Sequence, residues 1–235
     1  LSADLRPDHF SLLIFTVELV FVEYVRLGPP LAAGRLRLWL LGHAALYAVW
    51  ANLHPGCVLG VALRGLYAAG SFVEERLSRK GEEARPWRAL AACAVAALAA
   101  TVFTPHGFGL FHLMGQVQRD MKLIDPLVLE WRSADPRLLL HRPFWLLLVL
   151  LPAAWARERR LRWPHIFPAM LFGVMGVMHN RHIPYFAIAA LPAAALSLRE
   201  GPRLAAWRAK AALACGLLLM GGFPWSRVSA GLGRG

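Results

Sequence analysis

Long apolar runs, separated by short clusters of basic residues, dominate this sequence of 235 residues. A helix needs about 20 apolar residues to cross the hydrocarbon core of a bilayer, with about 17 as a lower limit. The runs that approach this length predict spans at residues 10–26, 36–52, 56–74, 87–103, 143–157, 164–179, 182–198 and 206–223. The sequence therefore predicts an all-α fold, a polytopic transmembrane helical bundle of about eight spans.

Composition favours lipid rather than water around these runs. Hydrophobic residues make up 57% of the chain and charged residues only 17%, compared with about 25% charged residues in ordinary soluble domains. In a soluble protein the net charge of +12 would suggest nucleic acid as a partner. Here the basic residues lie between apolar runs, so we expect membrane lipid as a partner and no nucleic acid. Cys57, Cys93 and Cys215 have no metal-ligand spacing, and no metal site is predicted.

The basic residues are divided unevenly between the two sides of the predicted bundle. Most Lys and Arg residues lie in the connections after the first, third, fifth and seventh spans. Because such connections stay in the cytoplasm, both ends are expected outside. An outside N-terminus without a signal-peptide pattern indicates at least one further span upstream. Residues 1–235 are therefore expected to be a single transmembrane domain and a fragment of a longer protein.

One connection, residues 104–142, is long and lies on the expected outer side. It contains the segment FGLFHLMGQVQ, whose spacing suits a short helix lying on the membrane surface. Long ordered loops in compact proteins are usually functional. This outer loop is therefore expected to contribute to a site.

Five polar clusters fall on the expected outer side, and polar groups that converge at one place make a binding site. In chain order they are RPDHF, WANLHPG, TPHG, LEWRSAD and HNRHIP, starting at residues 6, 50, 104, 129 and 179. Each has a plainer interpretation as turn residues, a helix end or side chains at headgroup level. In the last cluster Arg181 can bind phosphate bidentately, or it can extend to the headgroups. His179 and His182 are three residues apart, which alone is a weak indication of a metal.

Three ionisable residues, Glu18, His43 and Arg64, fall inside predicted spans. Each lies about eight residues from the outer end of its span, which at 1.5 Å per residue gives a depth of roughly 12 Å. Isolated charges at that depth are costly. We therefore expect a buried Glu18–Arg64 ion pair with His43 nearby, either as a structural contact or as a functional relay.

Five segments occur in an order that resembles a family of bacterial polytopic membrane proteins. They are RPDHFSLLIF, WANLHPGCVLG, TPHGFGL, EWRSAD and RHIPYFAIAALP. The corresponding family segments read approximately RPQLF, WANLHGGF, NPYG, EW and RxIPLFA, and the W-x-N-x-H turn is the most specific of them. The family is similar in layout to the GT-C glycosyltransferases, which include protein mannosyltransferases. The resemblance implies a multi-span protein of the bacterial inner membrane, with a catalytic site at the outer face and a polyprenyl-phosphate-linked sugar as donor.

The sequence departs from the family pattern at several positions. Asp8 and His9 stand where the family often has Gln-Leu, and Pro55 replaces a glycine. Thr104 and His106 fall in the NPYG position. GT-C enzymes carry their catalytic acid in the first external loop, which by the resemblance would lie upstream of residue 1. No residue is therefore assigned as the catalytic base by the resemblance.

A membrane glycosyltransferase is the expected function, with two alternatives left open. One is a transporter or flippase for a lipid or small anion, which would use Glu18, His43 and Arg64; the other is a non-catalytic assembly subunit. In the transfer reaction a carboxylate takes the proton of an acceptor hydroxyl, and cationic groups hold the phosphate leaving group. The carboxylates placed by location are Glu130, Asp125 and Asp8, with Asp135 in the same outer loop. The candidate substrate- and phosphate-binding residues are Arg181, His182, His54, Asn52 and Arg6. The cofactor stays unknown, with a divalent cation as one option.

Overall fold

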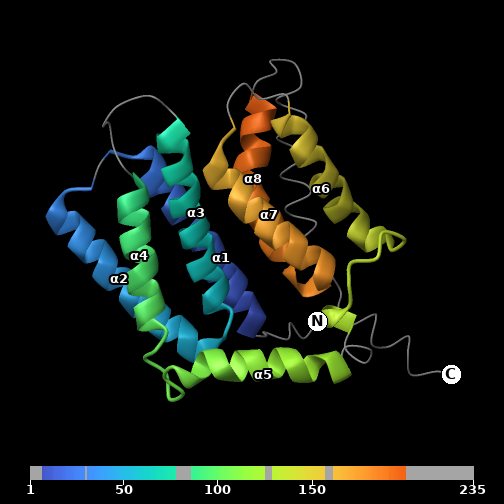
Figure 1. Ribbon diagram of the computed structural model, residues 1–235, viewed down its shortest axis with the longest axis horizontal. Coiled ribbons are helices and arrows are strands. Elements are labelled where there is room, and N and C mark those ends of the chain that lie inside the picture. The colour runs from blue at the N-terminus through green and yellow to red at the C-terminus, as the bar shows by residue number, and fades with distance from the viewer. Residues whose placement is uncertain (1–6, 30, 78–85, 125–128, 157–160, 200–235) are drawn as a thin grey trace, which may run out of the picture. The chain divides into compact units, whose positions relative to one another are not determined.

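The computed structural model describes residues 7–29, 31–77, 86–124, 129–156 and 161–199. Within them the chain forms eight α-helices and no strand (Figure 1), which confirms the all-α fold. The helices are α1 (Pro7–Leu27), α2 (Ala33–Leu53), α3 (Cys57–Leu77), α4 (Pro86–Ala100), α5 (Gly109–Ile124), α6 (Arg142–Trp155), α7 (Trp163–Met178) and α8 (Ile183–Arg199). Three short 3-10 helices are η1 (Leu129–Trp131), η2 (Leu139–His141) and η3 (Asn180–His182).

Seven of the predicted spans coincide with α1–α4 and α6–α8. The eighth, residues 206–223, lies outside the described residues. The helix predicted in the outer loop is α5. Among the described helices, α3 has both the length and the apolar composition to cross a membrane, whereas α4, α6 with η2, and α7 are apolar but shorter. One such helix is a weak indication by itself, because a buried helix of a soluble protein passes the same test.

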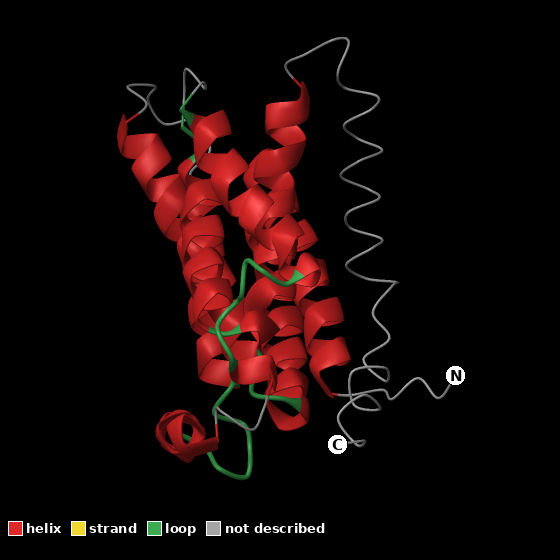
Figure 2. Ribbon diagram, turned by 90° about the vertical axis from the view of Figure 1, so that its right-hand side faces the viewer, coloured by secondary structure: helices red, strands yellow, loops and turns green. Residues whose placement is uncertain are grey.

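The described residues divide into two compact units. The first includes those within 1–134 and 159–190, and the second those within 135–158 and 191–235. In the first unit α3 lies against α1, α4 and α7, and α2 packs on α4. Figure 1 shows α5 running across the end of this unit where α1 and α3 begin and α2 and α4 end, and Figure 2, turned by 90°, shows it nearly end-on. We call this end the α5 end.

Helix α1 has two faces of unusual composition. Its buried face recurs every three or four residues, the repeat of an α-helix, and includes Ser11, Phe15, Glu18, Val22 and Val25. The other face exposes a stripe of large apolar side chains, namely Phe10, Leu13, Val17, Val20, Tyr24 and Leu27. The helix thus buries Ser11 and Glu18 among apolar side chains and also exposes a stripe of large apolar ones, whereas a surface helix in a soluble protein exposes mainly polar residues.

Two glycines of α3 allow its neighbours to come close. A Cβ atom on Gly60 would lie 2.5 Å from the Trp50 ring of α2. A Cβ atom on Gly70 would lie 2.5 Å from the backbone nitrogen of Pro164, in the first turn of α7. Proline is tolerated there because the first turn of a helix has no partner for its N–H groups. The contacts of α3 with α2 and α7 therefore depend on residues without a side chain.

Candidate functional site

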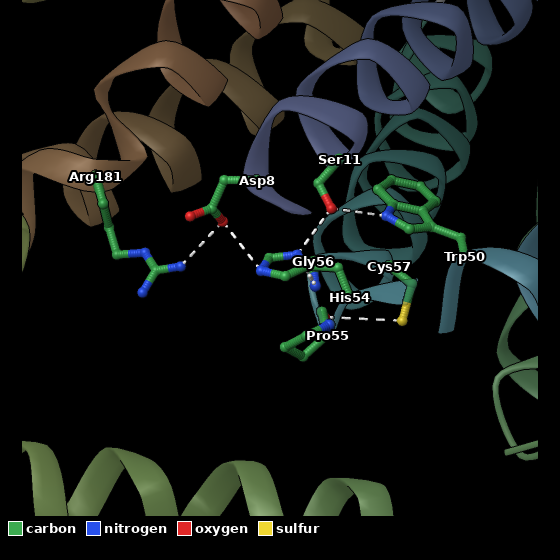
Figure 3. Close-up of polar contacts among 8 residues, drawn as sticks. All are labelled: Asp8, Ser11, Trp50, His54, Pro55, Gly56, Cys57 and Arg181. Atoms are coloured by element: carbon green, nitrogen blue, oxygen red, sulfur yellow. Dashed lines mark hydrogen bonds and ion pairs between the residues drawn. The ribbon is translucent and has the colours of Figure 1, made fainter. Parts of the chain in front are cut away.

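Segments from three of the polar clusters meet through side chains at the α5 end of the first unit (Figure 3). Asp8 comes from the first turn of α1, His54 from the turn between α2 and α3, and Arg181 from η3. His54 Nε2 lies 3.0 Å from Asp8 Oδ1, and Arg181 Nη2 donates to the same oxygen at 3.3 Å. The carboxylate of Asp8 therefore joins segments that are more than 40 and 170 residues away along the chain.

A chain of hydrogen bonds continues from His54 into the buried interior. Ser11 Oγ lies 2.8 Å from His54 Nδ1, and Trp50 Nε1 donates to Ser11 Oγ at 2.9 Å. Asp8 and Ser11 are three residues apart and share one face of α1, as the helical repeat requires. Trp50 and His54 are four apart at the end of α2. We call Asp8, Arg181, His54, Ser11 and Trp50 the Asp8 set (Figure 3).

The turn between α2 and α3 orients His54. Its backbone is extended, with φ −163° and ψ 140°, and its N–H still bonds the carbonyl of Trp50. Pro55 follows, and the Gly56 N–H donates back to His54 Nδ1 at 3.0 Å. A Cβ on Gly56 would lie 2.7 Å from that nitrogen and 2.8 Å from Ser11 Oγ. A glycine at this position therefore leaves the room that the His54 ring and the Ser11 hydroxyl occupy.

Asp8 is the most accessible member of the Asp8 set. Its side chain is 41% exposed, compared with 24% for Arg181 and 15% for His54. The hydrogen bond from His54 lowers the pKa of Asp8 below its ordinary value, with the charge of Arg181 acting in the same direction and burial opposing both. Asp8 precedes the apolar segment, which begins at Phe10. The bonds from His54 and from Arg181 both end on Oδ1 of the carboxylate.

The order Ser11, His54, Asp8 matches the connectivity of a nucleophilic triad, but the surroundings exclude that chemistry. Ser11 is fully buried, and its oxygen already accepts a hydrogen bond from Trp50. A substrate carbonyl therefore has no path to the hydroxyl. The accessible end of the chain is the Asp8 carboxylate.

The connection between α5 and α6 contacts Arg181 and its neighbours. The Arg181 guanidinium lies over the Trp131 ring, 4.6 Å from its centroid. His179 Nδ1 donates to the carbonyl of Trp131 at 2.7 Å, and the Asn180 N–H donates to the carbonyl of Arg132 at 2.9 Å. The EWRSAD segment is therefore bound to the end of α7 and to η3, which fixes the position of the guanidinium.

The other predicted site residues lie around this cluster or beyond the described residues. His182 is next to Arg181, with its ring 6.0 Å from that of His179. Glu130 is partly buried in η1. Asn52 is exposed and donates to the carbonyls of Ala48 and Phe103, each at 2.7 Å. Asp125 and Arg6 fall outside the described residues, within which no three His, Cys, Asp or Glu side chains are placed to hold a metal ion.

The predicted ion pair between Glu18 and Arg64 is confirmed. Arg64 Nε and Nη2 both contact Glu18 Oε2, and the Tyr47 hydroxyl donates to that oxygen at 3.3 Å. His43 Nε2 lies 3.8 Å from Glu18 Oε1. All four side chains are buried, and together they form the Glu18 set.

A third carboxylate of α1, Glu23, has the same kinds of partner. Glu23 Oε1 accepts from the Tyr67 hydroxyl at 2.8 Å and lies 2.7 Å from His165 Nε2. Its other oxygen accepts from Arg26 at 2.9 Å. This Glu23 set joins α1, α3 and α7, and the sequence interpretation missed it. Each of three carboxylates on α1 thus lies beside one arginine and one histidine.

Comparison with known proteins finds no match to the chain among protein-family models, curated proteins or solved structures.

Proposed function

We propose that the chain is a multi-pass protein of the bacterial inner membrane, with about eight spans and the α5 end at the outer face. The exposed apolar stripe of α1, with Glu18 buried on the other face, supports this proposal. Exposed apolar surface costs about 25 cal/mol per Å² in water, whereas lipid tails accept it. Helix α2 has the same pattern, since it exposes Leu38, Leu41 and Val49 and buries His43, Tyr47 and Trp50. Polar groups buried among helices are the usual arrangement of ionisable residues in a membrane protein.

At the outer face, the proposed activity is a GT-C-like glycosyl transfer from a polyprenyl-phosphate-linked sugar. The observation that carries it is the half-exposed Asp8 carboxylate with the Arg181 guanidinium 3.3 Å away. A base and a phosphate-binding cation are the two groups that this reaction requires. The resemblance of the surrounding segments to the GT-C-like family supports the same choice.

Asp8 is the proton acceptor in this proposal. Its Oδ2 atom accepts a hydrogen bond from the acceptor hydroxyl, whose oxygen attacks the anomeric carbon of the sugar. The bond between that carbon and the phosphate oxygen breaks, and the phosphate leaves with the electron pair. The hydroxyl proton passes to Asp8. General base catalysis of this kind contributes about 10²–10⁴-fold to a rate.

Arg181 holds the phosphate in this proposal. A guanidinium has five N–H donors, and only Nη2 is used in the bond to Asp8. The remaining donors stabilise the negative charge that develops on the leaving group. Stacking on Trp131 keeps the group in place. His182 lies beside this position, and Glu130 is the proposed contact for the acceptor or a divalent ion.

The test is the release of polyprenyl phosphate by the purified protein from a polyprenyl-phosphate sugar. Asp8→Asn and Arg181→Ala are each expected to lower kcat by about 10²-fold or more. Glu130→Ala tests the acceptor contact. Matched controls are Asp120→Asn and Arg119→Ala, which remove the same charges from exposed positions on α5. Unchanged release in both Asp8→Asn and Arg181→Ala would reject the assignment.

A second candidate function is transport or flipping of a lipid or small anion through the Glu18 set. The fully buried ion pair supports it, because ionisable groups inside a membrane bundle mark substrate and ion pathways in many transporters. Flux of a labelled lipid or anion into proteoliposomes tests this candidate. Loss of flux in Glu18→Gln, with no release of polyprenyl phosphate by the wild type, would favour transport over transfer.

A further inference from the structure

The hydrogen bonds around His54 can run in one direction only. A backbone amide donates and never accepts, so the Gly56 N–H at 3.0 Å requires a lone pair on His54 Nδ1. The proton of the neutral ring is then on Nε2, which faces Asp8 Oδ1 at 3.0 Å. The tautomer of a histidine is set by the partner of its other nitrogen. Here the partner of Nδ1 is the Gly56 amide, whose proton stays on its own nitrogen.

Ser11 and Trp50 extend the same direction into the interior. An indole N–H only donates, so Ser11 Oγ accepts from Trp50 Nε1. The hydroxyl proton of Ser11 is then directed at the lone pair of His54 Nδ1, 2.8 Å away. Both side chains have no exposed surface, so bulk water does not compete for these bonds. The donors therefore run from Trp50 to Ser11, to His54 and finally to Asp8.

We propose that Ser11 and Trp50 are positioning residues, which together with the Gly56 N–H hold His54 as an uncharged Nε2–H donor and so fix the Asp8 carboxylate with Oδ2 open to substrate. Both ring nitrogens of His54 are used inside the protein, so His54 is a positioning residue as well and not a phosphate ligand. The role of Asp8 itself rests on the proposed function.

The arrangement also restricts what can bind at Asp8. An ionised carboxylate accepts hydrogen bonds and donates none. The group that binds Oδ2 must therefore bring its own proton, as a hydroxyl or an ammonium does. An ionised carboxylate or phosphate placed directly against Oδ2 would meet a like charge, whereas the phosphate of the sugar donor binds Arg181. The sugar acceptor is thus assigned to compounds that are uncharged or cationic and that present a hydrogen-bond donor, such as a hydroxyl, to Oδ2.

The test measures the His54 ring directly, by ¹⁵N NMR of histidine-labelled protein in detergent. In the wild type we expect the proton on Nε2 and a hydrogen-bonded lone pair on Nδ1. Ser11→Ala should shift the Nδ1 resonance because it removes the hydroxyl that donates to this nitrogen. Trp50→Phe should shift it as well, because the Ser11 hydroxyl is then no longer held in place by the indole N–H. The controls are Ser71→Ala and Trp87→Phe, since Ser71 Oγ and Trp87 Nε1 are buried without a partner in the described part of the chain.

A parallel measurement of polyprenyl phosphate release separates this inference from the proposed function. Ser11→Ala and Trp50→Phe should lower kcat about tenfold, the size of one lost hydrogen bond, and leave KM unchanged. A proton on Nδ1 in the wild type would overturn the inference, and so would spectra of the two variants that match their controls. If the spectra change as expected while even the wild type releases no phosphate, the proposed function fails and the positioning of His54 stands. Helix content by circular dichroism identifies any variant that does not fold. If Ser11→Ala does not fold, Trp50→Phe still tests the inference, because it keeps an aromatic ring in the core.

Discussion

Arg64 and Glu18 form an ion pair in which neither side chain is more than 1% exposed. Each charge is therefore stabilised mainly by the other, by the Tyr47 hydroxyl that donates to Glu18, and by the Phe21 ring, which lies 4.8 Å from the Arg64 guanidinium carbon. Removing one member of such a pair leaves the other buried without a counter-charge. The Glu18 set is thus expected to respond very differently to single and double substitutions.

Glu18→Gln is expected to lower the free energy of unfolding by about 3–5 kcal/mol, the usual cost of breaking a buried pair. The double variant Glu18→Gln with Arg64→Met should recover most of this loss, because removing both charges is often neutral. Denaturant unfolding in detergent, followed by circular dichroism, measures both. A double variant whose loss equals the sum of the two single losses would contradict the coupling.

Gly70→Ala is expected to destabilise the protein by about 1–3 kcal/mol, the range for an overpacked contact. Its methyl group would lie 2.5–2.6 Å from backbone atoms of Trp163 and Pro164, which cannot move aside as a flexible side chain can. Gly65→Ala is the matched control on the same helix, because a Cβ there meets nothing within 4 Å. The control should gain up to about 1 kcal/mol from better helix propensity. Equal thermal midpoints for the two variants would show that α3 and α7 are not in this contact.

Gly56→Ala is expected to disturb the Asp8 set while leaving the helices folded. The new methyl group would displace the His54 ring and the Ser11 hydroxyl, which lie 2.7 and 2.8 Å from its position. Release of polyprenyl phosphate should therefore fall, and the ¹⁵N resonances of His54 should shift. Gly42→Ala, which meets nothing within 4 Å, is the control for a glycine-to-alanine change elsewhere in the bundle.

The helices of this protein are readable from the sequence because apolar length alone specifies most of them. The ends are less accurate where a turn competes with the helix. The span predicted to reach residue 103 ends at Ala100 in the structure, where Thr101 begins a turn and Thr101 Oγ1 donates to the carbonyl of Leu98. Pro105 follows closely, and the residue before a proline avoids helical backbone. Apolar composition continues through this turn, so it gave no sign of the helix end.

The site was only partly predictable, for a reason of geometry. Glu18 and Arg64 could be paired from the sequence because both lie at the same distance from a span end, and a buried charge needs a partner. The contact of Glu23 with His165 joins residues 142 positions apart and depends on how α7 is rotated about its axis. The role of Ser11 depends likewise on the rotation of α1 relative to His54. Hydrophobic spacing does not determine such rotations when a helix is apolar on most sides.

Asp8→Asn is expected to destabilise the protein near neutral pH by an amount that shrinks in acid. The pKa of Asp8 is lowered in the folded protein, chiefly by the hydrogen bond from His54, so its contribution is fully present above the unfolded value of about 3.9. That contribution is lost as pH falls through the lower folded pKa. The difference in thermal midpoint between wild type and Asp8→Asn should therefore be constant from about pH 7 to pH 5 and decline below about pH 4. Because the side chain is 41% exposed, solvent screening keeps the effect modest. In an Arg181→Gln background the difference should be smaller at every pH, since the Arg181 charge that lowers the pKa of Asp8 is gone. A difference that grows as the pH falls below 4 would contradict the ionised Asp8 on which the proposed chemistry depends.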